Sequence, residues 1–306
     1  MGKILIGTTS WTDKTLVDSK LFYPRGVSTP EQRLRYYASQ FPIVEVDSTY
    51  YGLPSEHNAL IWSERTPPGF IFHVKAFRLF TLHQTPPNAL PPDLRARLGK
   101  PAKKNFYYRD LPPEIVDELW RRFTLALEPL RATGRLGAIV FQFAPWLQYG
   151  EEGFDHIERC AERLRDDLLA VEFRNKSWFY DGTRENTLDF ERRLKLVHVV
   201  TDEPQGFPNS VEPIWEVTNT ELALVRFHGR NVQTWRKATA TAAERFDYLY
   251  TDDELREFVE PIKQTADQAK VLHVLFNNCR DNKAQLNAAT LAKMLGQLGP
   301  TPLPNP

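Results

Sequence analysis

The feature of this sequence that most constrains its fold is a repeated alternation between short β-like segments and longer helical ones. Eight segments are short, rich in β-branched or aromatic residues, and bounded by polar, Gly or Pro residues, as strands are. They are predicted at residues 3–8, 43–47, 70–75, 138–143, 169–174, 196–202, 222–228 and 271–277. Strands that alternate with helices form parallel sheets through right-handed crossovers. Eight such units in 306 residues favour an α/β fold with a single TIM-like (β/α)8 barrel over an open doubly wound sheet.

Helix signals fall between most of these strands. Thr29 and Gln32 form one capping box around Pro30, and Thr251 and Glu254 form another. Helices are predicted at residues 31–39, 55–65, 113–133, 154–165, 186–193, from 251 onwards, and at 287–298. We expect one domain over residues 1–300 with an insertion at 85–113 after the third strand, and a frayed tail at 301–306. The Pro-rich insertion is interpreted as a solvated loop, and a lid is the alternative.

Composition narrows the class of protein. The 39 basic and 39 acidic residues give a formal net charge of +0, which argues against a global basic field for nucleic acid but allows a local basic cleft. Two cysteines without a local pairing motif, Cys160 and Cys279, are typical of a reducing cytosol. No segment approaches the ~18 apolar residues of a membrane helix, and the N-terminus is interpreted as a strand. We therefore expect a cytoplasmic protein with no membrane partner.

Polar side chains gather where the predicted strands end, and these ends form the active-site face of a barrel. The predicted catalytic residues are Asp47, Glu172, Asp202 and His228. The predicted substrate-binding residues are Lys75, Arg78, Gln142, Arg174, Arg226 and Asn277, with Trp11, Tyr50 and Trp178 as aromatic rings beside them. Tyr51 and Trp235 are further rings at strand ends that could stack a sugar or base.

The spacing within three strands supports a site at this face. Three pairs of polar residues lie two positions apart: His73/Lys75, Glu172/Arg174 and Arg226/His228. The period of a strand places both members of each pair on one face, opposite an apolar face that suits packing against helices. We therefore expect all three pairs to point into the barrel mouth. A purely structural network of buried ion pairs is the alternative, and His198 and His273 are interpreted as core residues.

Several motifs, in order along nearly the whole chain, carry a family likeness. They are Gly7–Trp11 (GTTSW), Val44–Tyr51 (VEVDSTYY), Phe72–Lys75 (FHVK), Phe141–Phe143 (FQF), Val171–Arg174 (VEFR), Val225–Gly229 (VRFHG) and Phe276–Asn278 (FNN). Taken together, they resemble the domain of unknown function 72 family, also called YecE-like. The resemblance implies a TIM-barrel-like fold with a pocket at the carboxyl ends of the strands. It implies no assigned activity.

The mixture of Arg, Lys, carboxylate and His residues predicts a site for a phosphorylated ligand. Arginine forks recognise phosphate through paired hydrogen bonds, and a carboxylate or His228 would act as general acid or base. The leading hypothesis is therefore a hydrolase directed at phosphoesters, either nuclease-like or acting on a phosphorylated small molecule. No Gly-x-Gly-x-x-Gly or P-loop motif points to a dinucleotide or nucleotide-triphosphate fold.

Other functions remain open at this stage. A non-catalytic module that binds an anionic metabolite or a short nucleic-acid strand would use the same mouth. A glycosidase-like enzyme with two of the carboxylates, or a sugar-phosphate lyase or isomerase, ranks lower. No cofactor is expected. A divalent metal on Glu172, Asp202 and His228 is the alternative, although Arg174 and Arg226 would crowd it.

Overall fold

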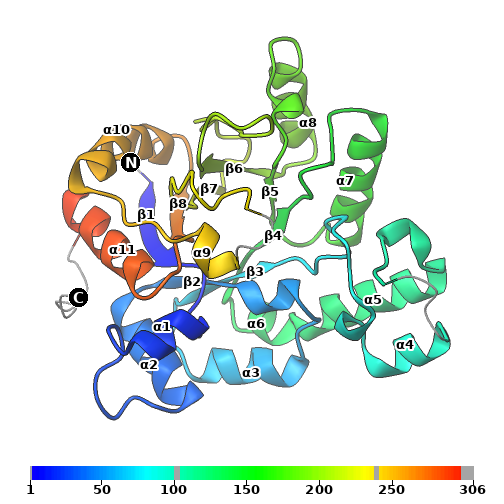
Figure 1. Ribbon diagram of the computed structural model, residues 1–306, viewed down its shortest axis with the longest axis horizontal. Coiled ribbons are helices and arrows are strands. Elements are labelled where there is room, and N and C mark those ends of the chain that lie inside the picture. Colours follow the sequence, from blue (N-terminus) through cyan, green and yellow to red (C-terminus); the bar gives the residue numbers. More distant parts are fainter. Residues whose placement is uncertain (1, 100–103, 238–240, 298–306) are drawn as a thin grey trace.

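A computed structural model describes residues 2–99, 104–237 and 241–297. Eight parallel strands form a closed barrel in the order β1 to β8, and helices ring it (Figure 1). The strands are β1 (Lys3–Thr8), β2 (Ile43–Val46), β3 (Ile71–Lys75), β4 (Leu136–Gln142), β5 (Leu169–Glu172), β6 (Val197–Asp202), β7 (Leu222–Phe227) and β8 (Val271–Phe276). All eight strands predicted from the sequence are present, and the TIM-like (β/α)8 fold is confirmed.

The helices are more numerous than the sequence patterns predict. They are α1 (Lys14–Ser19), α2 (Pro30–Gln40), α3 (Glu56–Glu64), α4 (Pro92–Arg97), α5 (Pro113–Ala126), α6 (Glu128–Ala132), α7 (Glu151–Arg163), α8 (Arg184–Arg193), α9 (Ala242–Arg245), α10 (Asp252–Ala266) and α11 (Lys283–Met294). Both predicted capping boxes are formed, at Thr29 and at Thr251. The helix predicted over residues 113–133 is divided after Ala126, because Pro129 has no N–H to donate and belongs in a first turn.

The chain between β3 and α5 is the predicted insertion, and it is partly structured. It contains α4, and residues Thr85 and Phe106 pair through two backbone hydrogen bonds of 2.8 Å. The predicted frayed tail, 301–306, lies outside the described residues. Among the residues that the structure describes, no helix is long and apolar enough to span a membrane.

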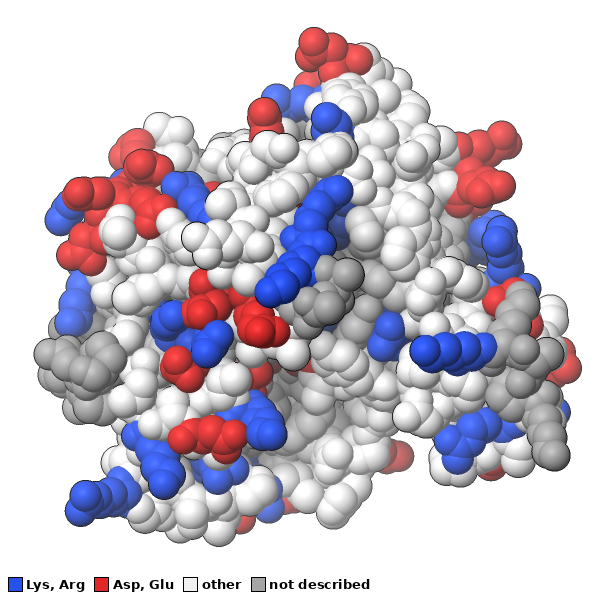
Figure 2. Space-filling model, viewed as in Figure 1, with Lys and Arg blue, Asp and Glu red and all other residues white. Residues whose placement is uncertain are grey.

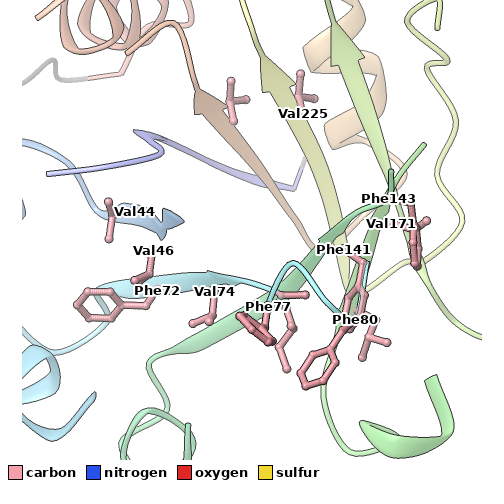
Figure 3. Close-up of a cluster of buried hydrophobic side chains, with 14 of the residues drawn as sticks. Val44, Val46, Phe72, Val74, Phe77, Phe80, Phe141, Phe143, Val171 and Val225 are labelled. Carbon is pink, nitrogen blue, oxygen red and sulfur yellow. The ribbon is translucent and has the colours of Figure 1, made fainter. Parts of the chain in front are cut away.

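The main core lies between the strands and the surrounding helices. Figure 3 shows part of it, with outward-facing side chains of several strands packed together. Val44 and Val46 on β2 alternate with Glu45, and Phe72 and Val74 on β3 alternate with His73. The strand period therefore sends apolar side chains outward to the helices and leaves the polar ones facing the barrel interior.

A smaller apolar cluster fills the barrel interior below the mouth. Its buried residues are Ile43, Ala138, Val140, Ala170, Val197, Val199, Leu222, Leu224 and Leu275. His73 and His273 also lie inside, with Nε2 of His73 2.8 Å from Nδ1 of His273. Both rings are buried, so the prediction that His273 is a core residue is confirmed and His73 lies below the mouth rather than at it.

Candidate functional site

A cavity of about 630 Å³ opens at the carboxyl ends of the strands. Six of the residues predicted for the site line it, namely Asp47, Tyr50, Lys75, Gln142, Arg174 and Asn277. Loops and α9 supply more of the wall, including His83, Trp146, Trp235, Arg236, Arg245 and Phe246. Figure 2, seen in the direction of Figure 1, shows basic and acidic side chains interspersed over this face, without a broad area of one sign.

A network of buried charges lies beneath the cavity, and Glu172 is at its centre. Oε1 of Glu172 accepts from Nε2 of Gln142 at 2.6 Å, from Nη1 of Arg174 at 3.0 Å and from Nε2 of His228 at 2.9 Å. Oε2 accepts from Nη1 of Arg226. The side chain has no exposed surface. Glu172 is therefore saturated with donors, and its chemistry is to orient the groups around it.

Arg226 joins carboxylates on opposite parts of the barrel. One of its amino groups contacts Glu172 on β5, and the other donates to Oε1 of Glu45 on β2 at 2.7 Å. All three side chains are fully buried. Burial alone would raise the pKa of Glu172, but Arg226, His228 and Arg174 together outweigh it and hold this pKa well below its usual range.

A directed chain of hydrogen bonds fixes the protonation of His228. The Thr9 hydroxyl donates to Oδ1 of Asn277 at 2.5 Å, so the amide nitrogen of Asn277 is the atom that faces Nδ1 of His228, at 2.8 Å. Nδ1 then accepts, and Nε2–H donates to Glu172. Burial lowers the pKa of His228 to about 4, so the ring is neutral at pH 7. Both ring nitrogens are used, which leaves His228 as a positioning residue rather than a free base.

This arrangement predicts an acid sensitivity that belongs to His228. Its folded pKa lies below its unfolded value of about 6.5, so the unfolded state binds more protons and stability falls as the pH is lowered from about 6.5 to about 4. Over this range the free energy of unfolding should fall in both proteins. We expect the fall in His228→Gln to be smaller than that in the wild type by roughly 1–3 kcal/mol. Urea unfolding at pH 7 and pH 4.5 measures the difference. Equal losses in both proteins would contradict a neutral, buried His228.

Two cations reach the cavity from this network. Nζ of Lys75 contacts Oδ1 of Asp47 at 2.8 Å, and Nη2 of Arg174 contacts Oε2 of Glu203 at 2.9 Å. Burial would lower the pKa of Lys75, but Asp47 and Glu45 together outweigh it and raise this pKa. Each cation also lies beside an aromatic ring. Lys75 is 5.0 Å from the centre of Tyr50, and Arg174 is 5.0 Å from the centre of Trp235.

Apart from Glu172, Arg226 and His228 in the buried network, four predicted site residues lie away from the cavity wall. Asp202 packs toward α10, where it accepts from the Tyr250 hydroxyl at 2.5 Å and from Nη2 of Arg230 at 3.0 Å. The cause is strand parity, because Val197 and Val199 face the interior and Asp202 is on the other face of β6. Trp178 is fully buried outside the barrel, stacked 4.3 Å from Phe173.

The other two residues are closer to the mouth. Trp11 is 6 % exposed and packs edge-on against Trp62, with ring centres 5.8 Å apart, in a neighbouring pocket. Arg78 lies behind Tyr50, 5.2 Å from the ring centre. The expected aromatic rim therefore consists of Tyr50, Tyr51, Trp146, Trp235 and Phe246 rather than of Trp11 and Trp178.

Sequence reasoning missed two buried carboxylates of the site. Glu45 lies two residues before Asp47 on β2, the same spacing that identified the other pairs, so its signal was present. Glu203 lies one residue after Asp202 and takes the inward position instead. His83, Trp146, Arg236 and Phe246 come from loops and Arg245 from the short helix α9, where no strand period marks them.

The three residues weighed as a metal site are not brought together. Glu172 and His228 are in contact, but Asp202 is on the outer face of β6. Across residues 2–99, 104–237 and 241–297, no group of three or more His, Cys, Asp or Glu side chains is placed to hold a metal ion.

Comparisons with known proteins agree with this fold and identify the family. Residues 5–306 match the family described as "Protein of unknown function DUF72". The UPF0759 protein YunF of Bacillus subtilis (strain 168) is 31% identical over 295 residues, which cover 95% of this chain and 94% of YunF. A crystal structure of a DUF72 family protein from Enterococcus faecalis V583 superposes with a TM-score of 0.78 at 27% identity, covering 99% of this chain and 98% of that one. A crystal structure of a DUF72 family protein from Thermotoga maritima MSB8 superposes with a TM-score of 0.73 at 30% identity, covering 96% of this chain and 100% of that one. The chain belongs to the DUF72 family.

Proposed function

We propose that the barrel mouth binds a phosphorylated ligand that carries a ring, and that the protein hydrolyses phosphoesters there. The observation that carries this proposal is the placement of Lys75 and Arg174. Both lie on the cavity wall, both are held by carboxylates, and both have an aromatic ring within 5.0 Å. A guanidinium and an ammonium with fixed positions suit phosphate oxygens, and the rings suit a base or a sugar.

The buried network supports binding by holding Arg174 in advance. Nη1 of Arg174 donates to Glu172 and Nη2 pairs with Glu203, so the guanidinium plane is fixed before a ligand arrives. A pre-organised donor loses little conformational entropy when it binds an anion. The side chain is 17% exposed, which leaves part of it available to the ligand.

The catalytic role in this proposal falls to Asp47. Glu172 and His228 are saturated by their neighbours, whereas the Asp47 side chain is 30% exposed and lines the cavity. Lys75 holds one of its oxygens, so Asp47 would accept a proton from the attacking water as the water oxygen bonds to phosphorus. The bond from phosphorus to the leaving oxygen breaks in the same step, and solvent water returns a proton to the departing alkoxide. Lys75 and Arg174 would stabilise the charge that develops on the phosphoryl oxygens.

Binding is tested with Arg174→Gln. We expect the wild type to bind inorganic phosphate, nucleoside monophosphates or sugar phosphates, and the variant to bind them at least about tenfold more weakly, since a charge-assisted hydrogen bond contributes about 1.5–3 kcal/mol. Titration calorimetry measures both, with Mg²⁺, Mn²⁺ or Zn²⁺ present and absent. Arg230→Gln is the matched control, because Arg230 pairs with Asp202 away from the cavity. Equal weakening by the two variants, or no binding by the wild type, would refute the site.

Turnover separates the hydrolase from a binding module. The binding module is favoured by one observation, the saturation of Glu172 and His228, which leaves few groups free to move protons. Release of phosphate or alcohol from mono- and diesters, lost in Asp47→Asn while phosphate binding remains, would support the hydrolase. Tight binding without turnover of any ester would support the module.

A further inference from the structure

A second hollow, of about 420 Å³, lies beside the mouth at the ends of β1 and β2, and we call it the acidic side pocket. Its wall includes the carboxylates of Asp13, Glu45 and Asp47 and the rings of Trp11, Tyr51 and Trp62. We propose that this pocket binds a primary ammonium group carried by the ligand. The mouth as described above uses cations on its wall, so this pocket offers the opposite chemistry.

The argument rests on one oxygen of Glu45. The Glu45 side chain is fully buried, and Arg226 engages only its Oε1, at 2.7 Å. Oε2 of Glu45 has no hydrogen-bond partner among the described residues, although the residue forms part of the pocket wall. A buried carboxylate oxygen without a donor is costly, so a ligand N–H that reaches it replaces a missing interaction. Burial raises the pKa of Glu45 despite the nearby charges of Arg226 and Lys75, which is consistent with incomplete compensation.

The neighbouring groups favour a cation at this position. Only Oδ1 of Asp47 is held by Lys75, and Asp13 adds a further carboxylate whose Oδ1 caps α1. Of the basic residues on the wall, Lys14 is exposed and Arg65 pairs with Glu31 at 3.4 Å. Aromatic faces beside carboxylates are a common setting for organic cations. A primary ammonium is selected over a quaternary one because Oε2 needs a hydrogen-bond donor.

The pocket and the mouth are contiguous. Asp13, Asp47, Tyr51, Asn277 and Cys279 line both hollows. A ligand with an anionic group at Lys75 and Arg174 therefore has room to place an ammonium group in the acidic side pocket. This combined preference, for an aminated phosphorylated ligand, rests on the proposed function, whereas the ammonium site by itself does not.

The first experiment uses the wild-type protein and three simple probes. Propylamine hydrochloride supplies a primary ammonium, tetramethylammonium chloride supplies the same charge without an N–H donor, and sodium chloride matches ionic strength. Trp11 and Trp62 line the pocket, so tryptophan fluorescence reports binding there. We expect a saturable change with propylamine only. No saturable change with propylamine, or an equal change with tetramethylammonium, overturns the proposal.

The second experiment uses Glu45→Gln, which keeps an oxygen for Arg226 but removes the charge. We expect the Kd for propylamine to rise about tenfold to a hundredfold, as loss of a charge-assisted hydrogen bond predicts. Glu221→Gln is the matched control and leaves the Kd unchanged, because Glu221 is a half-exposed carboxylate that pairs with Lys270 and lines neither hollow. An unchanged Kd in Glu45→Gln refutes the role of Glu45. If Glu45→Gln does not fold, the comparison of propylamine with tetramethylammonium decides the question.

Inorganic phosphate and 3-aminopropyl phosphate distinguish this proposal from the proposed function. Tighter binding of 3-aminopropyl phosphate than of phosphate or propylamine supports both sites. Propylamine binding without phosphate binding refutes the anion site in the mouth and leaves the ammonium site standing. Phosphate binding without propylamine binding refutes the ammonium site and leaves the anion site in the mouth standing.

Discussion

Arg226→Met is expected to destabilise the protein by about 3–5 kcal/mol. Arg226 is the shared partner of Glu45 and Glu172, and all three side chains are fully buried. Methionine fills much of the same volume, so the loss comes from two carboxylates that become buried without their guanidinium. Urea unfolding of both proteins at pH 7 measures the change in free energy.

Its matched control is Arg163→Met. Arg163 also pairs with a carboxylate, that of Asp117, but both side chains are largely exposed, at 38% and 59%. Surface pairs contribute little to stability, so we expect a nearly unchanged midpoint. If Arg226→Met also left the unfolding midpoint nearly unchanged, Glu45 and Glu172 would be taking up protons at little cost. The stability of the network would then not depend on its charges.

Gly7→Ala is the second large effect that we expect. A Cβ atom at Gly7 would lie 2.1 Å from the carbonyl oxygen of Ile43 and 2.8 Å from Cγ1 of the same residue. Gly7 is paired with Ile43 where β1 meets β2, so the clash is with the backbone of the adjacent strand and is relieved only if the strands separate. Ordinary overpacking lowers the free energy of unfolding by up to roughly 3 kcal/mol, and we expect Gly7→Ala to lower it by at least that much. Urea unfolding measures the change.

Gly52→Ala separates this steric effect from the general effect of replacing glycine. No atom lies within 4 Å of a Cβ built at Gly52, and its backbone does not require positive φ. The variant should be unchanged or more stable by about 0.4–1 kcal/mol, because alanine restricts the unfolded chain. A wild-type midpoint for Gly7→Ala would show that β1 and β2 can move apart without penalty.

The sequence predicted the barrel well because the strand period of 2 is a local property. The apolar alternation at β3, β5 and β7 located both the strands and the inward-facing pairs, and Glu172, Arg174, Arg226 and His228 do meet at the mouth end of the barrel. Their saturation with one another was not predictable, because it depends on distances between strands that are far apart in the chain. The cavity residues outside the strands were missed because no strand period marks them.

The predicted directions of two side chains, Asp202 and Trp178, were wrong for a simpler reason. The alternation of inward and outward side chains is uncertain where a strand ends. Asp202 was expected to face the interior, but Glu203 does so, and the difference is a single residue. Trp178 follows a turn after β5, where the alternation has ended, and its ring packs against Phe173 instead of reaching the mouth. A strand pattern fixes side-chain direction only as far as the strand itself continues.

The ion pair between Arg226 and Glu45 can form only late in synthesis of the chain. The two residues are 181 positions apart, and β2 leaves the ribosome long before β7. Until then Glu45 has no guanidinium to meet, and an early half-barrel would expose this carboxylate on an unfinished inner wall. Closing such long loops is slow, so the mouth of the barrel is completed only when the C-terminal strands arrive. A nascent chain halted before β7 would therefore lack the guanidinium that joins Glu45 to Glu172.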